Sequence, residues 1–147
     1  MSDPAAAGFR NPDANAICAM LRQVKTIAVV GFSRKADRPS YRIARALRAF
    51  GYRVIAVRPG IGEAFGEKAY ARLADVPETV DLVDVFRKSA DAGKVVDECI
   101  ALGIPRVWLQ DGVVNEDAAR RAQEAGMFVV MDRCIMRDYS RLCGGNS

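Results

Sequence analysis

Residues 29–60 read "VVGFSRKADRPSYRIARALRAFGYRVIAVRPG", and their pattern is the strongest indication of the fold. The first apolar segment of this stretch ends at Gly31, and the second ends at Val57. Between them, residues 39–50 begin with a proline, carry apolar side chains at helical spacing and stop at Gly51, which predicts a helix. A strand, a helix and a second strand in this order predict two parallel strands joined by a crossover helix.

The rest of the chain continues the alternation of apolar strands and amphipathic helices. Asp13, Ser89 and Asn115 are predicted to be N-caps. Residues 58–80 are the exception, because this glycine-containing segment is too irregular for a long helix. The predicted elements are helices at 14–23, 39–50, 90–102 and 115–126 and strands at 25–31, 52–57, 81–86, 106–110 and 127–131.

Five short strands separated by helices predict a single α/β domain with a doubly wound parallel sheet, spanning residues 13–142 between frayed ends at 1–12 and 143–147. The 147-residue chain, half of it apolar and 27% charged, fits one domain with an ordinary core. Its apolar runs fall well short of the roughly 20 residues that cross a bilayer, and the N-terminus has no signal-peptide pattern. We therefore expect a cytoplasmic protein without a membrane partner.

The residue types present exclude several kinds of site. Histidine is absent, so catalysis by Ser-His-Asp or Cys-His groups is excluded, as is a histidine general base. The cysteines are scattered, without a C-x-x-C spacing: Cys18, Cys99, Cys134 and Cys143. We expect no metal site, and we expect the cysteines to be reduced thiols.

The net charge of +4 comes from 22 basic and 18 acidic residues. The basic residues are interspersed with acids or spaced along predicted helices, and no arginine-rich run is interleaved with aromatic residues. This pattern does not favour nucleic acid as a partner. A small ligand that carries several phosphates also accounts for a modest local excess of positive charge.

A doubly wound sheet binds ligands beyond the carboxyl ends of its strands, near the point where the strand order reverses. The candidate loops are therefore residues 31–40, 58–60, 86–89, 109–113 and 132–136. In the first loop, Gly31 permits close backbone approach, Ser33 offers a hydroxyl, and cations surround a helix N-terminus whose free N–H groups attract anions. We predict that this loop binds phosphate. The alternative is a tight turn at Gly31 with a solvated basic rim.

Arg58, directly after the second strand, bears on the choice of cofactor. An NAD site usually places Asp or Glu at the end of this strand to hold the ribose hydroxyls, whereas a phosphorylated ribose calls for arginine. NADP and coenzyme A both carry such a phosphate, so Arg58 favours these two ligands over NAD. A structural arginine that faces solvent is the alternative.

Four motifs follow one another along the chain: the opening stretch, "FGEKAYARLADVPETVDLVDVFRKS", "VWLQDGVVNEDAARRAQEAG" and "VVMDRC". Over roughly residues 20–142 they resemble the small stand-alone CoA-binding proteins. These are similar to the CoA-binding domain of the succinyl-CoA synthetase alpha subunit and of related acyl-CoA synthetases. The resemblance implies a Rossmann-like sheet that binds coenzyme A, or an acyl-CoA, across its C-terminal edge, usually without an assigned reaction.

The resemblance and the loop positions together give the candidate cofactor-binding residues: Gly31, Phe32, Ser33, Arg34, Lys35, Arg38, Pro39, Ser40, Arg58, Pro59, Phe86, Arg87, Leu109, Gln110, Asp111, Gly112 and Cys134. Cys134 follows the last strand, where the synthetase domain also has a cysteine near the cofactor. One departure concerns the synthetase pattern P-G-K after the second strand, which reads Pro59-Gly60-Ile61 here. The lysine is missing, and we expect Arg58 to substitute for it.

The synthetase reaction needs a phosphorylated histidine and a nucleotide-grasp partner chain, and this sequence has no histidine. We expect a binding, carrier or regulatory module without chemistry of its own, open to a partner protein or to homo-oligomers. One alternative is an NADP-dependent enzyme, whose proton donor would be Tyr41 or Tyr139. Another is an accessory subunit of an acyl-CoA enzyme.

Asp81 and Asp84 flank the third strand and invite comparison with an acid/base pair. Residues three apart in a strand point to opposite faces of the sheet. We therefore expect both carboxylates to make local hydrogen bonds at the strand edge. Trp108 and Phe86 are expected to be core residues or pocket walls, against which an adenine or pantetheine group can lie.

Overall fold

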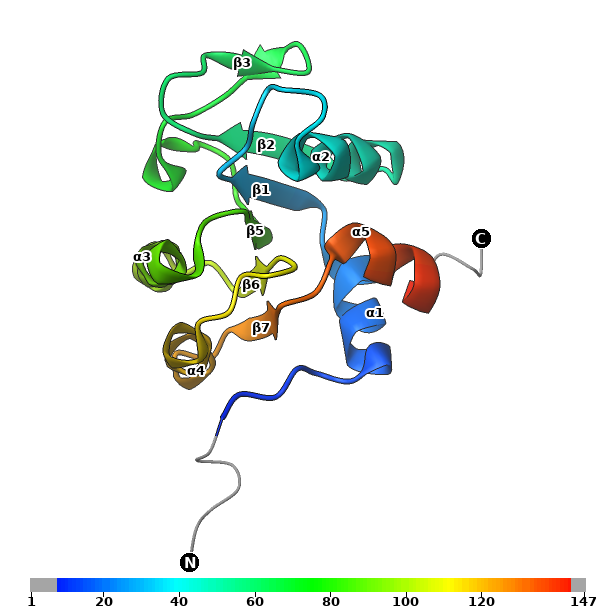
Figure 1. The fold of residues 1–147 in the computed structure, drawn as a ribbon, viewed down its shortest axis with the longest axis vertical. Coiled ribbons are helices and arrows are strands. Elements are labelled where there is room, and N and C mark those ends of the chain that lie inside the picture. The colour runs from blue at the N-terminus through cyan, green and yellow to red at the C-terminus, as the bar shows by residue number, and fades with distance from the viewer. Residues whose placement is uncertain (1–7, 144–147) are drawn as a thin grey trace, which may run out of the picture.

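The computed structural model describes residues 8–143 (Figure 1). It contains one five-stranded sheet in which every neighbouring pair is parallel and the order is β2-β1-β5-β6-β7. The strands are β1 (Thr26–Val30), β2 (Arg53–Val57), β5 (Leu82–Val85), β6 (Arg106–Leu109) and β7 (Phe128–Met131). The chain passes from β1 to β2 on one side and then returns to β5 on the other, so the strand order reverses at β1. The predicted doubly wound sheet is confirmed.

Helices cover both faces of the sheet (Figure 1). One face carries α1 (Ala14–Gln23), α2 (Pro39–Ala49), α5 (Ile135–Asp138) and the π-helical turn η3 (Tyr139–Cys143), and the other carries α3 (Ser89–Leu102) and α4 (Glu116–Glu124). The strands are buried from both sides, which explains their nearly continuous apolar sequences. Trp108 is fully buried beneath the first group of helices. No helix in the described part of the chain is long and apolar enough to span a bilayer.

Two of the predicted N-caps are confirmed and one is wrong. The side chains of Asp13 and Asn115 each accept a hydrogen bond from the backbone N–H three residues ahead. Ser89 is the first residue of α3 and not its cap, a position that Lys88 occupies. The Ser89 hydroxyl instead donates to the carbonyl of Gly112 at 3.2 Å, because the loop after β6 passes directly over the start of α3.

The segment after β2 is irregular, as predicted. It contains a two-stranded antiparallel ribbon, β3 (Glu63–Ala64) with β4 (Glu67–Lys68), and one 3₁₀ turn, η2 (Leu73–Asp75). Between β3 and β4 the ring of Phe65 lies 5.6 Å from the ring of Phe32 and 5.2 Å from that of Tyr41. The ribbon is thereby attached to the loop after β1 and to the start of α2.

A part of each predicted frayed end lies within the described residues. Residues 1–7 and 144–147, which belong to the predicted frayed ends, lie outside the described residues. Within the described part, Asn11 bonds both the N–H and the carbonyl of Met131 in β7 at 2.8 and 2.9 Å, so this segment is held against the sheet. Cys143, also predicted to be frayed, is buried at the end of η3.

The prediction that all cysteines are reduced is wrong for two of them. Cys18 in α1 is joined to Cys143 by a disulfide across 125 residues of sequence, with the Cα atoms 5.4 Å apart. Cys99 and Cys134 are free and buried. The pairing escapes sequence reasoning because spacing along the chain does not reveal that α1 and η3 pack together.

Candidate functional site

The five strands end in register at one edge of the sheet. Val30 of β1 lies opposite Val57 of β2 and Val85 of β5, and the pairing continues to the last residues of β6 and β7. The residue that follows each strand therefore begins a loop beside its neighbours. Gly31 and Phe86 follow the central pair β1 and β5, whose loops continue into α2 and α3 on opposite faces of the sheet. A crevice opens where these loops diverge.

Gly31 is required by this close approach. A Cβ added at Gly31 would lie 2.1 Å from the carbonyl oxygen of Phe86, and the residue has a φ of 87°. Its N–H donates to the carbonyl of Val57 at 3.0 Å, while the N–H of Phe86 donates to the carbonyl of Val30 at 2.8 Å. The loops after β1, β2 and β5 thus share one hydrogen-bonded junction. Any side chain at Gly31 would push that junction apart.

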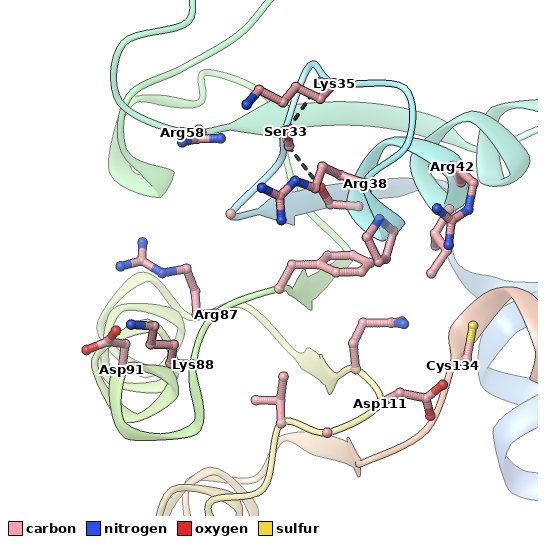
Figure 2. A pocket seen from close by; sticks show the side chains of 18 of the residues that line it. Ser33, Lys35, Arg38, Arg42, Arg58, Arg87, Lys88, Asp91, Asp111 and Cys134 are labelled. Carbon is pink, nitrogen blue, oxygen red and sulfur yellow. Dashed lines mark hydrogen bonds between the residues drawn. The ribbon is translucent and has the colours of Figure 1, made fainter.

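A cleft of about 1280 Å³ lies over this junction (Figure 2). Cationic side chains gather on one side of it, which we call the cationic end: Lys35, Arg58, Arg87 and Lys88. Asp111 and Cys134 lie on the other side, which we call the thiol end. Gln110 belongs to this end because its side chain accepts a hydrogen bond from Ile135, and Met136 is the next residue in the chain. Arg38 and Arg42 from the start of α2 also line the cleft. Among the described residues, the walls carry these six cations and two carboxylates, those of Asp91 and Asp111.

None of the six cations forms a salt bridge with any residue in the range 8–143. Arg58 donates one hydrogen bond to the carbonyl of Phe32 at 3.3 Å, and Arg42 donates one to the carbonyl of Asp37 at 2.6 Å. An arginine has five N–H donors, so most of the donors on both side chains stay open to a ligand. The cleft is therefore a site that attracts anions.

Two serines shape the loop after β1. The N–H of Ser33 donates to the hydroxyl of Ser40 at 2.9 Å, and the N–H of Lys35 donates to the hydroxyl of Ser33 at 3.2 Å (Figure 2). Ser40 is almost completely buried at the first turn of α2, which has no side-chain cap. Both hydroxyls act as acceptors within the loop, and each retains a proton to donate toward the cleft. The loop is thus held in place before any ligand arrives.

The thiol end is held together by internal polar contacts. The N–H of Ile135 donates to the side-chain oxygen of the buried Gln110 at 3.1 Å. Arg137 donates two hydrogen bonds, each 3.0 Å long, to the carboxylate of Asp111, and these bonds hold the pKa of Asp111 below its ordinary value. The indole N–H of Trp108 donates to the carbonyl of Arg133 at 2.7 Å. Cys134 is buried in this wall.

Most candidate residues line the cleft: Gly31, Ser33, Lys35, Arg38, Pro39, Ser40, Arg58, Pro59, Phe86, Arg87, Gln110, Asp111, Gly112 and Cys134. Three candidates do not. Phe32 is fully buried against aromatic rings, and the side chain of Leu109, the last residue of β6, is fully buried in the core. Arg34 is exposed but is not part of the cleft wall, which its neighbour Lys35 forms instead.

Six wall residues were not among the candidates: Arg42, Ile43, Lys88, Asp91, Val113 and Met136. Lys88, Val113 and Met136 fall inside the predicted loops, so their positions in the sequence were a sufficient signal. Arg42 and Ile43 lie one turn into α2, and Asp91 lies in the first turn of α3. The first turns of the crossover helices border the cleft together with the loops that precede them.

Other polar residues lie outside the cleft. Asp81 accepts hydrogen bonds from the N–H groups of Lys25 and Thr26, as expected at a strand edge. The same expectation is wrong for Asp84, which is fully buried and has no hydrogen-bond partner for either carboxylate oxygen in the described part of the chain. Burial raises the pKa of Asp84 well above its ordinary value. No group of acids and cysteines suited to a metal ion occurs within residues 8–143.

The two tyrosines considered as proton donors are placed elsewhere. The ring of Tyr41 packs against Phe32 and Phe65, and that of Tyr139 stacks on Phe50 with 4.1 Å between ring centroids. Neither tyrosine is among the residues that line the cleft. The polar side chains that line the cleft are therefore mainly cations and hydroxyls, together with the thiol of Cys134.

Residues 25–140 match the CoA binding domain family. The chain belongs to this family. It is also similar to the uncharacterized protein YneT of Bacillus subtilis, with 40% identity over 127 residues that make up 86% of this chain and 94% of YneT. A hypothetical protein from Pyrococcus horikoshii has a solved structure with a TM-score of 0.86 and 32% identity, covering 97% of this chain and 99% of that one.

Parts of larger enzymes are similar as well. The ADP-forming acetate–CoA ligase of Methanocaldococcus jannaschii is 29% identical over 80 residues, which cover 54% of this chain but 11% of the ligase. The structure of a dinucleotide-forming acetyl-coenzyme A synthetase from Ca. Korarchaeum cryptofilum has a TM-score of 0.66 and 26% identity, covering 77% of this chain and 28% of the synthetase. This CoA-binding domain thus corresponds to a small portion of those ligases.

Proposed function

We propose that this CoA-binding domain holds coenzyme A or an acyl-CoA in the cleft over the carboxyl edge of its sheet. In this proposal it acts in the cytoplasm as a binding, carrier or regulatory module without chemistry of its own. The observation that carries the proposal is the set of six cleft cations, none paired with an acid in the described chain. Coenzyme A brings two groups of phosphates that such cations would neutralise.

The pyrophosphate is assigned to the loop after β1. The hydroxyls of Ser33 and Ser40 have protons to donate, and the N-terminus of α2 attracts negative charge. Lys35 and Arg38 supply the compensating charge. Because Gly31 has no side chain, the phosphates can approach the backbone closely at this point.

The 3′-phosphate is assigned to Arg58. Its guanidinium uses one N–H on the carbonyl of Phe32 and keeps the others for a forked contact. The pantetheine arm then runs toward the thiol end, where Ile43, Met136 and Cys134 offer apolar or sulfur-containing surface. This orientation separates the strongly charged half of the ligand from its thiol.

The proposal is tested by thermal unfolding with CoA, dephospho-CoA, NADP and NAD at equal concentrations. CoA is expected to raise the Tm most, by the amount that corresponds to RT ln(1 + [L]/Kd), about 2.7 kcal/mol at a hundredfold excess over Kd. Equal stabilisation by NAD would contradict the proposal. A larger effect of NADP than of CoA would favour the NADP-dependent alternative.

The orientation has its own test. Oxidised CoA, a symmetric disulfide, is incubated with the protein. The thiolate of Cys134 attacks one sulfur, forms a mixed disulfide and releases one CoA thiol. We expect peptide mapping to find the adduct on Cys134 and not on Cys99, since burial and the nearby charge of Glu98 raise the pKa of Cys99 to about 12. An adduct on Cys99, or no adduct at all, would contradict the orientation in which the CoA thiol lies near Cys134. CoA binding itself is tested separately by the unfolding experiment.

A further inference from the structure

The C-terminal helix, α5 with η3, connects the thiol end of the cleft to the disulfide. At its start, the N–H of Ile135 donates to the side chain of Gln110, and two residues later Arg137 holds the carboxylate of Asp111. At its other end, Cys143 is bonded to Cys18 of α1. One short helix is thus fixed to the cleft at its first turn and to α1 by a covalent bond at its last residue.

We propose that the Cys18–Cys143 pair is a redox-sensitive site whose state sets the affinity of the cleft for its CoA ligand. The inference rests on the proposed function, because it assigns regulation to the same cleft. The reductant is a low-molecular-weight thiol, and the oxidant of the reverse reaction is the corresponding disulfide.

The helix depends on the disulfide because it is short. Its α-helical and π-helical parts have four and five residues, too few to be stable without packing. Its non-covalent anchors include the ring of Tyr139, which stacks on Phe50 of α2 at 4.1 Å and meets the ring of Tyr52 edge-on at 5.9 Å. The buried carboxylate of Asp138 also accepts two hydrogen bonds from Arg133. Breaking the bond at Cys143 leaves η3 held by these aromatic contacts and by apolar packing.

The chemistry is a thiol–disulfide exchange. Two molecules of a small thiol attack in succession: the sulfur–sulfur bond between Cys18 and Cys143 breaks, each cysteine sulfur gains a proton, and the two small thiols leave joined as one disulfide. The reverse exchange consumes the small disulfide and restores the bond. The exchange involves only Cys18, Cys143 and the small thiol. Cys99 and Cys134, the free cysteines of the described chain, take no part in it.

The redox state of the Cys18–Cys143 pair affects the cleft through the first turn of α5. Residues at the first turn of α5 position Gln110 and Asp111, and Met136 itself forms part of the wall. A ligand that contacts this wall binds the docked helix better than a frayed one. Loosening the helix therefore lowers the affinity, and by reciprocity the bound ligand protects the disulfide from reduction.

The test compares oxidised protein with protein reduced by a phosphine, which introduces no competing thiol. The ligand is a CoA thioether, which cannot exchange with disulfides, and its Kd is measured by calorimetry. We expect reduction to raise the Kd roughly fivefold or more and to lower the Tm by about 10 °C. The variant Cys143→Ser should bind like reduced wild type whether or not the phosphine is present. Cys99→Ala, which leaves the pair intact, should retain the difference between oxidised and reduced protein.

Three outcomes overturn the inference. If the CoA thioether binds oxidised and reduced protein equally, the proposed function stands and the redox control is wrong. If thiol titration of air-oxidised, unfolded protein counts all four cysteines as free, no disulfide forms. If neither form binds the thioether, the proposed function fails and the redox control fails with it.

Discussion

The two ends of the cleft differ in whether their polar side chains have partners within the protein. At the cationic end, Lys35, Arg58, Arg87 and Lys88 face the cleft without an acidic partner in the described chain. At the thiol end, Asp111 is paired with Arg137 and Gln110 with the start of α5. Unpaired exposed cations contribute little to folding, whereas a network of satisfied groups supports the fold and the site together. Substitutions should therefore separate binding from stability at the cationic end and change both at the thiol end.

The largest effect is expected at Gly31, the junction beneath both ends. Gly31→Ala places a Cβ about 2.1 Å from the carbonyl oxygen of Phe86 and also strains a φ of 87°. We expect a loss of about 4 kcal/mol or more in the free energy of unfolding, together with loss of CoA binding. The matched control is Gly60→Ala, where φ is 86° and no atom lies within 4 Å of the added Cβ. The control should lose only about 1–2 kcal/mol in urea unfolding; equal losses would show that the close approach is unimportant.

A buried carboxyl group without a hydrogen-bond partner contrasts with the exposed unpaired cations. Asp84 is fully buried with no hydrogen-bond partner in the described chain, and burial raises its pKa. The unfolded chain releases the Asp84 proton at a lower pH than the folded chain, so stability falls as pH rises from about 4 toward the raised pKa. The fall is about 1.4 kcal/mol per pH unit in that window.

Asp84→Asn removes this titration. We expect the variant to be more stable than wild type at pH 7, with a difference that grows by about 1.4 kcal/mol per pH unit between pH 4 and the raised pKa and closes as pH approaches 4. Denaturant unfolding across this pH range measures the difference. Asp81→Asn is the control, because Asp81 accepts two backbone N–H bonds and its substitution should destabilise. If the stability difference between Asp84→Asn and wild type does not vary with pH, the raised pKa of Asp84 is contradicted.

At the cationic end, Arg58→Ala should change binding with little effect on stability. If Arg58 holds the 3′-phosphate, its charged hydrogen bonds contribute on the order of 1.5–3 kcal/mol, roughly a 10- to 150-fold preference for CoA over dephospho-CoA. The variant should lose most of this preference and keep its affinity for dephospho-CoA. Arg34→Ala is the matched control, with the same charge removed from a residue outside the cleft wall.

Calorimetry at fixed salt compares the two variants, since general attraction to the basic loop is screened as ionic strength rises. Arg34→Ala should leave the preference for CoA intact. If Arg58→Ala weakens both ligands equally, Arg58 contacts the pyrophosphate or is structural.

The smallest effect is expected at Asp111, whose pKa is lowered by the hydrogen bonds from Arg137. This contribution to stability is present above the ordinary pKa of aspartate and is lost as pH falls through the lowered value. The pair is exposed, so Asp111→Asn should cost only about 0.5 kcal/mol at pH 7. It should also weaken CoA binding slightly, as a wall residue of the thiol end. If Asp111→Asn binds CoA less well but is as stable as wild type, the prediction that substitutions at the thiol end change binding and stability together is contradicted.

Strand ends were the part of the site that the sequence could reveal. Parallel strands finish at one edge, so the residues after Val30, Val57 and Val85 had to meet, and the structure brings their loops together there. Adjacent residues within a loop were harder to assign: Arg34 and Lys35 are both basic, and only the backbone path after Gly31 decides which of them faces the cleft. Arg42 was missed because helix geometry, and not loop position, brings it to the wall.

The C-terminal helix shows a different limit. Ile135, Tyr139 and Leu142 recur at helical spacing, a signal that was available but too short to stand out beside the longer helices. Its disulfide to Cys18 had no local signal, because the pairing depends on the packing of α1 against η3. The doubly wound sheet implied that its strands are covered on both faces, but the sequence did not show that Asp84 would be buried without a hydrogen-bond partner.

The proposed function requires the cleft to select coenzyme A over other nucleotides. Native mass spectrometry of the protein mixed with equal, limiting amounts of CoA, NADP and NAD measures this selectivity in one experiment. The complex with one CoA should dominate the spectrum, and this complex should be much reduced for Arg58→Ala. A dominant complex with NADP or NAD, or no complex with CoA, would contradict the proposed function.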